Sequence, residues 1–132
     1  MTKTFEHDYN WYDGVGHPLT GVPRPVPYDE PNLGTFTTGI LVSNKYFIGV
    51  APQAQYIACK ANNLQGIDTP EWMLKCLEFM YAPHDLNGEN PSLERRPHIV
   101  YMQYCVSCFK DYHYSAMYEA ITKVRIELDC SE

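Results

Sequence analysis

The most regular hydrophobic pattern in the chain lies between Thr69 and Tyr81. Apolar residues recur there at spacings of three and four, which places them on one face of a helix. Thr69 is a favourable N-cap residue, Pro70 suits the first helical position, and Glu71 adds an acid to the first turn. The pattern predicts a helix with the apolar face Trp72, Met73, Cys76, Leu77 and Met80.

Two further stretches have the apolar density of buried strands. Residues 55–61 read Q-Y-I-A-C-K-A, and residues 97–104 read P-H-I-V-Y-M-Q-Y. Strands of a parallel sheet are covered on both faces and therefore show continuous apolar runs in place of strict alternation. Both stretches are predicted as buried strands.

Two more helices are expected. Thr35 or Thr37 can cap a short apolar helix that ends near Val42. Near the C-terminus, Ser115 to Leu128 carries one helical stripe. Buried strands that alternate with amphipathic helices predict an α/β fold, with helices on both sides of a small, mainly parallel sheet.

The first third of the chain lacks such a period. Residues 5–14 are aromatic and acidic and are predicted to be irregular. Residues 17–31 contain five prolines, which favour an extended connecting loop. Asp8, Asn10 and Asp13 offer oxygens to a hard cation, but turn-forming, solvated carboxylates are the favoured interpretation.

Composition narrows the function classes. The chain has 132 residues, of which 45% are hydrophobic, and this size predicts a single domain over residues 1–132. A formal net charge of −6 without a Lys or Arg cluster argues against a nucleic-acid partner. No apolar run is long enough for a membrane span, and residues 1–6 lack the apolar core of a signal peptide. We expect a cytosolic product or one whose leader has been removed.

The centre of the chain carries recognisable sequence words. Residues 33–62 contain L-G-T-F-T-T-G, a variable loop and then G-V-A-P-Q-A before the predicted strand, and residues 82–91 read A-P-H-D-L-N-G-E-N-P. These words resemble those of the subtilisin-like serine proteases (subtilases), in particular of one secreted bacterial branch. The resemblance covers roughly residues 5–125. It implies a partial three-layer α/β/α subtilisin-like domain.

The same resemblance implies that the catalytic machinery is absent. Leu33 stands in the position of the family's catalytic histidine, and Phe36 replaces a second histidine of that word. The segments that bear the family's aspartate, oxyanion asparagine and nucleophilic serine are expected outside this chain. No serine of this chain lies in a nucleophile-elbow word. We therefore predict a catalytically inactive pseudoprotease that acts by binding. The alternative is a portion of an active subtilisin-like serine endopeptidase, whose triad lies in missing sequence or in another chain.

A binding edge also follows from the resemblance. Gln103, Tyr104 and Cys105 occupy the places of the S-W-G word, which pairs with the substrate backbone in the family. The strand edge from Tyr101 to Cys105 is therefore the predicted site for a peptide or protein partner, or for self-association. The alternative is that another segment of the chain covers this edge.

The cysteines and one acidic loop allow alternative interpretations as disulfide or metal sites. Cys59 and Cys76 could form a disulfide in an oxidising compartment and would be buried thiols in the cytosol. Cys105 and Cys108 form a C-x-x-C pair, but plain thiols or a disulfide are favoured over a zinc site completed by His113 and Cys130. No metal ligand is assigned. Calcium is a possible cofactor in the loop after residue 84, where Asx turns are favoured; its candidate ligands are Asp85, Asn87, Glu89 and Asn90.

Overall fold

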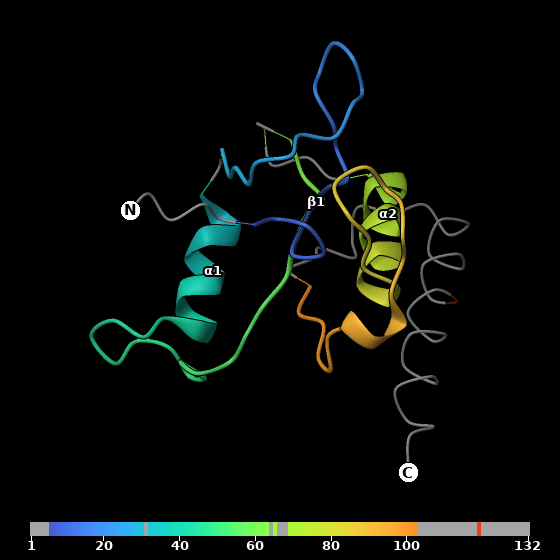
Figure 1. Cartoon of the computed structure of the whole chain (residues 1–132). Coiled ribbons are helices and arrows are strands. Elements are labelled where there is room, and N and C mark those ends of the chain that lie inside the picture. The colour runs from blue at the N-terminus through green and yellow to red at the C-terminus, as the bar shows by residue number, and fades with distance from the viewer. Residues whose placement is uncertain (1–5, 31, 64, 66–68, 103–118, 120–132) are drawn as a thin grey trace, which may run out of the picture.

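The computed structural model describes residues 6–30, 32–63, 65, 69–102 and 119. Figure 1 shows two α-helices beside a short sheet, joined by long loops. The elements are β1 (Trp11–Asp13), α1 (Leu33–Val42), β2 (Ala58–Lys60), α2 (Pro70–Tyr81) and the 3₁₀ helix η1 (Leu93–Arg95).

The sheet consists of β1 and β2, which run parallel. Trp11 pairs with Ala58 and Asp13 pairs with Lys60. The backbone pairing extends by one residue at one end, where Gly14 donates to the Lys60 carbonyl at 3.0 Å. The parallel direction agrees with the prediction from the buried apolar run.

Two predictions in this half of the chain need correction. The stretch 5–14 was predicted to be irregular, yet it contains β1. The buried residues of β1 are Trp11 and Asp13. Because one of the two inward positions is an acid, the alternation of apolar and polar residues expected of a strand is not visible in the sequence. The predicted strand 55–61 is shortened to Ala58–Lys60, because β1 offers only three residues for pairing.

Helix α2 forms as predicted and supplies most of the core. The Thr69 hydroxyl accepts a hydrogen bond from the Trp72 amide at 3.3 Å, which is the expected N-cap. The predicted apolar face is partly wrong, since Phe79 is only 1% exposed and was not assigned to it. Phe79 is buried because its ring stacks on Tyr12 at 5.5 Å and meets the His84 ring at 5.1 Å.

Helix α1 begins earlier than expected and is capped differently. Asn32 precedes it in the left-handed conformation, and no side chain of the N-cap residue binds the helix. The predicted threonine caps are wrong: Thr37 donates back to the Leu33 and Gly34 carbonyls within the helix. Instead, the Asp29 carboxylate accepts from the Thr35 amide at 2.6 Å and from its hydroxyl at 2.7 Å.

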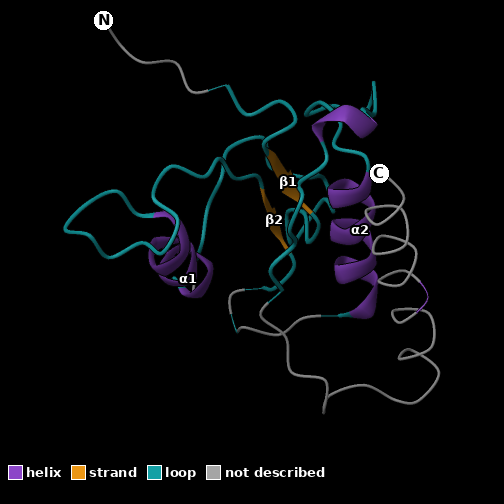
Figure 2. Ribbon diagram, turned by 90° about the horizontal axis from the view of Figure 1, so that it is seen from below, coloured by secondary structure: helices purple, strands orange, loops and turns teal. Residues whose placement is uncertain are grey.

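The views in Figures 1 and 2 agree that α1 and α2 lie on opposite sides of the strands. Helix α2 packs against both strands, whereas α1 buries none of its residues. The described elements therefore form a small α/β fold whose core lies between the sheet and α2.

The predicted strand 97–104 is wrong for the part that the structure describes. Residues 97–102 have no strand conformation, and Ile99 is 85% exposed. The apolar run was misleading because none of these six residues pairs with β1 or β2, and only Met102 packs against the core. The end of that predicted strand and the predicted helix 115–128 lie outside the described residues, apart from position 119.

Candidate functional site

A cluster of charged side chains lies at the carboxyl ends of the two strands. Asp13 is the last residue of β1 and Lys60 the last residue of β2, and they are 1% and 5% exposed. The carboxyl ends of parallel strands are where open α/β sheets place their ligand sites. Charged groups are rarely buried without a partner, so this cluster is the first candidate for chemistry.

The Asp13 carboxylate is saturated with donors. One oxygen accepts from the backbone amides of Val15 and Gly16, at 3.2 and 3.0 Å. The other oxygen accepts from the Arg24 amide at 3.1 Å and from the Tyr28 hydroxyl at 2.9 Å. Four donors therefore occupy the lone-pair sites of this carboxylate.

Lys60 is held by an acid and a ring. Its ammonium lies 3.2 Å from a Glu30 carboxylate oxygen, as an ion pair without hydrogen-bond geometry, and 4.6 Å from the centre of the Tyr28 ring. The Arg24 guanidinium lies over the same ring at 4.2 Å and 3.8 Å from Glu30. Tyr28 therefore lies within cation–π distance of both cations.

Tyr28 stays protonated over the physiological range. Burial raises the pKa of this phenol well above its ordinary value, and its hydrogen bond to the Asp13 carboxylate raises it further. A neutral phenol can donate to Asp13, whereas a phenolate would place two negative charges together. Tyr28 therefore serves as a hydrogen-bond donor in this cluster.

What this cluster does is structural. Its hydrogen bonds and ion pair attach the loop from Gly14 to Glu30 to the ends of the two strands. This loop precedes α1 in the chain. Trp11 also holds this loop, because its indole N–H donates to the Arg24 carbonyl at 2.9 Å. Our expectation of a turn-forming, solvated carboxylate at Asp13 is half right: it accepts from the amides two and three residues further on, as in a turn, but it is buried and not solvated.

The cluster could not be predicted from the sequence, because its residues lie in segments that are far apart along the chain. Asp13 closes an aromatic segment, Lys60 follows an apolar run, and Tyr28 lies among prolines. The available signal was the pairing of an inward acid with an inward lysine at the ends of two strands. The Asp13–Lys60 register would have shown it.

Leu33, the residue expected from the resemblance at the position of the subtilase histidine, is the first residue of α1. Its side chain is 42% exposed and cannot exchange a proton. Two described histidines bind backbone groups: a His17 ring nitrogen accepts from the Leu19 amide at 3.3 Å, and His84 contacts the Asp85 carbonyl at 2.8 Å. Neither of these contacts pairs a histidine with a serine hydroxyl.

Cys59 and Cys76 are bonded to each other in the structure, and their Cα atoms are 5.6 Å apart. The bridge links β2 to α2 directly behind the polar cluster. Gly14 leaves room for it, because a Cβ at this position would lie 3.1 Å from the Cys76 sulfur and 3.0 Å from the Lys60 carbonyl oxygen.

The loop proposed for calcium is a hydrogen-bonded turn. The Asp85 carboxylate accepts from the Asn87 and Glu89 amides at 3.0 and 2.9 Å, and from the Asn90 side chain at 2.9 Å. The hydrogen bond from the Glu89 amide, then that from Asn90, lowers the pKa of the Asp85 carboxyl. These bonds match the Asx-turn interpretation. Within the described part of the chain, no three His, Cys, Asp or Glu side chains form a metal-binding group.

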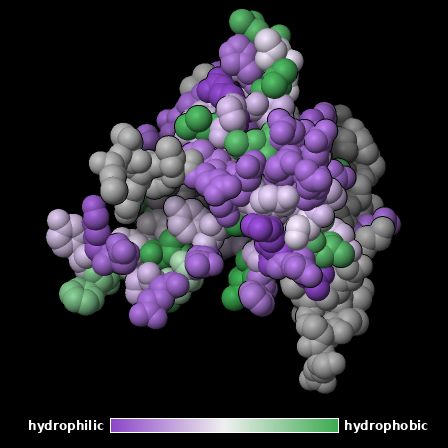
Figure 3. Space-filling model, in the orientation of Figure 1, coloured by the Kyte–Doolittle hydropathy of each residue, from purple (hydrophilic) through white to green (hydrophobic). Residues whose placement is uncertain are grey.

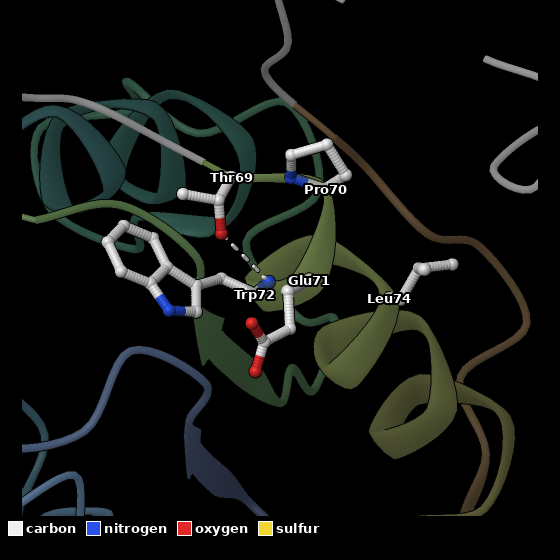
Figure 4. A pocket seen from close by; sticks show the side chains of 5 residues that line it. All are labelled: Thr69, Pro70, Glu71, Trp72 and Leu74. Atoms are coloured by element: carbon white, nitrogen blue, oxygen red, sulfur yellow. Dashed lines mark hydrogen bonds between the residues drawn. The ribbon is translucent and has the colours of Figure 1, made fainter. Parts of the chain in front are cut away.

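A shallow depression surrounds the start of α2, with a volume of about 430 Å³. Figure 4 shows the Trp72 and Leu74 side chains on different sides of the helix start, with Glu71 between them and the Thr69 hydroxyl bonded to the Trp72 amide. These four residues and Pro70 line the depression. The Thr69 hydroxyl already accepts from the Trp72 amide, and we assign no ligand to this depression.

The predicted peptide-binding edge at Gln103, Tyr104 and Cys105 lies outside the described residues, as do Cys108 and Cys130. Of the helices that the structure describes, none has the length and apolar character required to cross a membrane.

The chain is similar to Bacillopeptidase F of Bacillus subtilis (strain 168), with 37% identity over 99 residues. The match covers 72% of this chain. The chain therefore contains a region related to a subtilisin-like protease. It spans only 6% of the length of that relative. No family model matches the chain, and no solved structure does.

Proposed function

We propose that this chain is a catalytically inactive, subtilase-related module that acts by binding. The observation that carries the proposal is Leu33 at the start of α1, where the resemblance requires a histidine. A serine protease needs a base that accepts the proton of its nucleophile, and an alkyl side chain cannot do so. The neighbouring polar cluster offers no replacement, because Asp13 is saturated and Tyr28 is neutral.

The second candidate is a portion of an active subtilisin-like serine endopeptidase. The similarity to a much longer protease supports it, since the other catalytic groups would then come from sequence outside the 132 residues or from another chain. Leu33 still argues against this candidate, because a complete triad would require a histidine at that place.

The proposed module includes a three-layer subtilisin-like arrangement and a peptide-binding edge. The positions of α1 and α2 on opposite sides of the strands support the first part (Figure 2). The edge at Gln103, Tyr104 and Cys105 rests on the resemblance alone. A bridged Cys59–Cys76 pair supports an oxidising compartment as the place where the module acts.

A peptide-hydrolysis assay tests the proposal. We expect no cleavage of a mixed peptide library by the parent chain, by Leu33→His, or by Leu41→His. Leu41 is the matched control because it is also a partly exposed leucine of α1. Saturable cleavage by the parent contradicts the proposal. Cleavage by Leu33→His alone favours the enzyme-portion candidate.

A further inference from the structure

Residues 32–56, here called the α1 sector, contain no buried residue. The sector comprises α1 and the loop that leads towards β2, and Lys45 is its only charged residue. Figure 3 shows hydrophobic atoms at its lower left, over the loop after α1. The large apolar side chains exposed in the sector are Leu33, Phe36, Ile40, Leu41, Tyr46, Phe47, Ile48, Val50 and Tyr56.

The loop of the α1 sector holds its aromatic side chains in exposed positions. Val50 and Ala51 donate backbone hydrogen bonds to the Ile40 and Leu41 carbonyls, at 3.0 and 2.8 Å, so the loop folds back on the end of α1. At its tip, Tyr46 and Phe47 both have positive φ angles, and Phe47 is fully exposed. Residues in this conformation carry strain that the surrounding structure must maintain.

Helix α1 lacks the polar face of a surface helix. Leu33, Phe36 and Ile40 follow spacings of three and four, and its other residues are apolar or small and uncharged. A helix without a charged face is normally enclosed. Among the described elements, α2 packs against both strands, whereas α1 buries none of its residues.

The exposed area is large enough for a stable interface. Phe36, Tyr46, Phe47 and Tyr56 are 65%, 87%, 103% and 61% exposed. With about 200 Å² for each fully exposed aromatic side chain, these four alone offer roughly 600 Å². A standard interface buries about 800 Å² per partner, and the aliphatic residues of the sector add to the aromatic area.

We propose that the α1 sector is the interface of a homodimer. A nearly uncharged apolar surface calls for a partner surface of the same kind, and the described part of the chain offers this chemistry at the same sector of a second copy. The acidic residues behind the net charge of −6 all lie outside the sector, so two copies meet there without facing carboxylates. This interface is distinct from the predicted edge at Tyr101 to Cys105.

Sedimentation equilibrium of the parent chain and three variants tests the interface. We expect a mass that reaches a plateau at twice 15.2 kDa. Phe36→Asp and Phe47→Asp should each weaken dimerisation about tenfold or more, because a buried aromatic is replaced by a charge. Leu19→Asp is the matched control: Leu19 is 90% exposed but lies outside the sector, and this variant should remain dimeric. Unchanged circular dichroism of all three variants excludes loss of fold as the cause.

Three results would overturn the interface. A monomeric parent over the whole concentration range means that another segment of the chain or a different protein covers the sector. A dimer that both aspartate variants leave intact places the contact elsewhere. A mass that rises without a plateau shows open-ended aggregation. The interface and the proposed function can fail separately. If the protein dimerises and also cleaves peptides, the interface is retained and the proposal of an inactive module is wrong.

Discussion

At the scale of single residues, Asp13 has the largest set of polar contacts in the described core. Its carboxylate accepts four hydrogen bonds while only 1% exposed. Because an amide has one acceptor oxygen and adds two donors, Asp13→Asn must leave buried donors unpaired. Hydrogen bonds to charged groups are worth more than neutral ones, so the loss is large.

We expect Asp13→Asn to lower the free energy of unfolding by about 2 to 3 kcal/mol. Urea denaturation followed by circular dichroism measures it. Asp8→Asn is the control: Asp8 accepts a hydrogen bond from the Leu86 amide at an exposed site, so this substitution should cost less than about 1 kcal/mol. Equal losses in the two variants would show that the donors around Asp13 contribute little.

Two glycines give opposite expectations for the same substitution. A Cβ at Gly14 would lie 3.0 to 3.1 Å from the Lys60 and Trp72 carbonyl oxygens and the Cys76 sulfur. Since two of these neighbours are backbone atoms, Gly14→Ala should destabilise the fold by about 1 to 3 kcal/mol. A Cβ at Gly39 meets no atom within 4 Å, so Gly39→Ala in α1 should stabilise by about 0.5 to 1 kcal/mol. Thermal unfolding of both variants checks the sign, and a stabilising Gly14→Ala would contradict the packing described.

At the scale of elements, the bridge between Cys59 and Cys76 joins β2 to α2 across 17 positions of sequence. Closing a loop of this length restricts the unfolded chain, which corresponds to about 3 kcal/mol of stability. The described core is small, so this contribution is a large share of the total. We expect the double variant Cys59→Ala, Cys76→Ala to unfold at a clearly lower urea concentration than the oxidised parent.

Peptide mapping without reduction provides the covalent evidence for the same prediction. Peptides that contain Cys59 and Cys76 should be recovered as a linked pair. A link from either of them to Cys130 would contradict the placement of β2 against α2.

Sequence patterns predicted some elements better than others. Helix α2 was predictable because a cap, a proline and an apolar face all indicate the same start. Strand β1 was not, since three residues are too few for a period and one of them is a buried acid. The run 97–102 shows the opposite error: its apolar residues indicated a buried strand, but Ile99 faces solvent where no strand pairs with it.

The candidate site was only partly predictable, for a similar reason. A short helix ending at Val42 was predictable from local sequence, but its start at Leu33 was not, because the threonines expected to cap it lie inside the helix. The contacts of Asp13 with Tyr28 and of Lys60 with Glu30 join distant segments. They depend on how the proline-rich loop folds over the strand ends, and hydrophobic periodicity carries no information on that path.

At the scale of the whole molecule, the described residues form a small α/β unit, related in part to a protease, with an apolar helix on one side and a disulfide-linked core on the other. We propose that this unit has no reactive serine, because Leu33 stands where the subtilase resemblance requires the base that would activate one. Loss of the base in a triad removes several orders of magnitude in rate.

The most direct test of that claim is intact-protein mass spectrometry after treatment with a fluorophosphonate probe, which labels activated serines. We expect an unchanged mass for the folded chain under conditions in which an active subtilase is labelled completely. Stoichiometric addition of one probe to a serine of the folded chain, lost on heat denaturation, would contradict it.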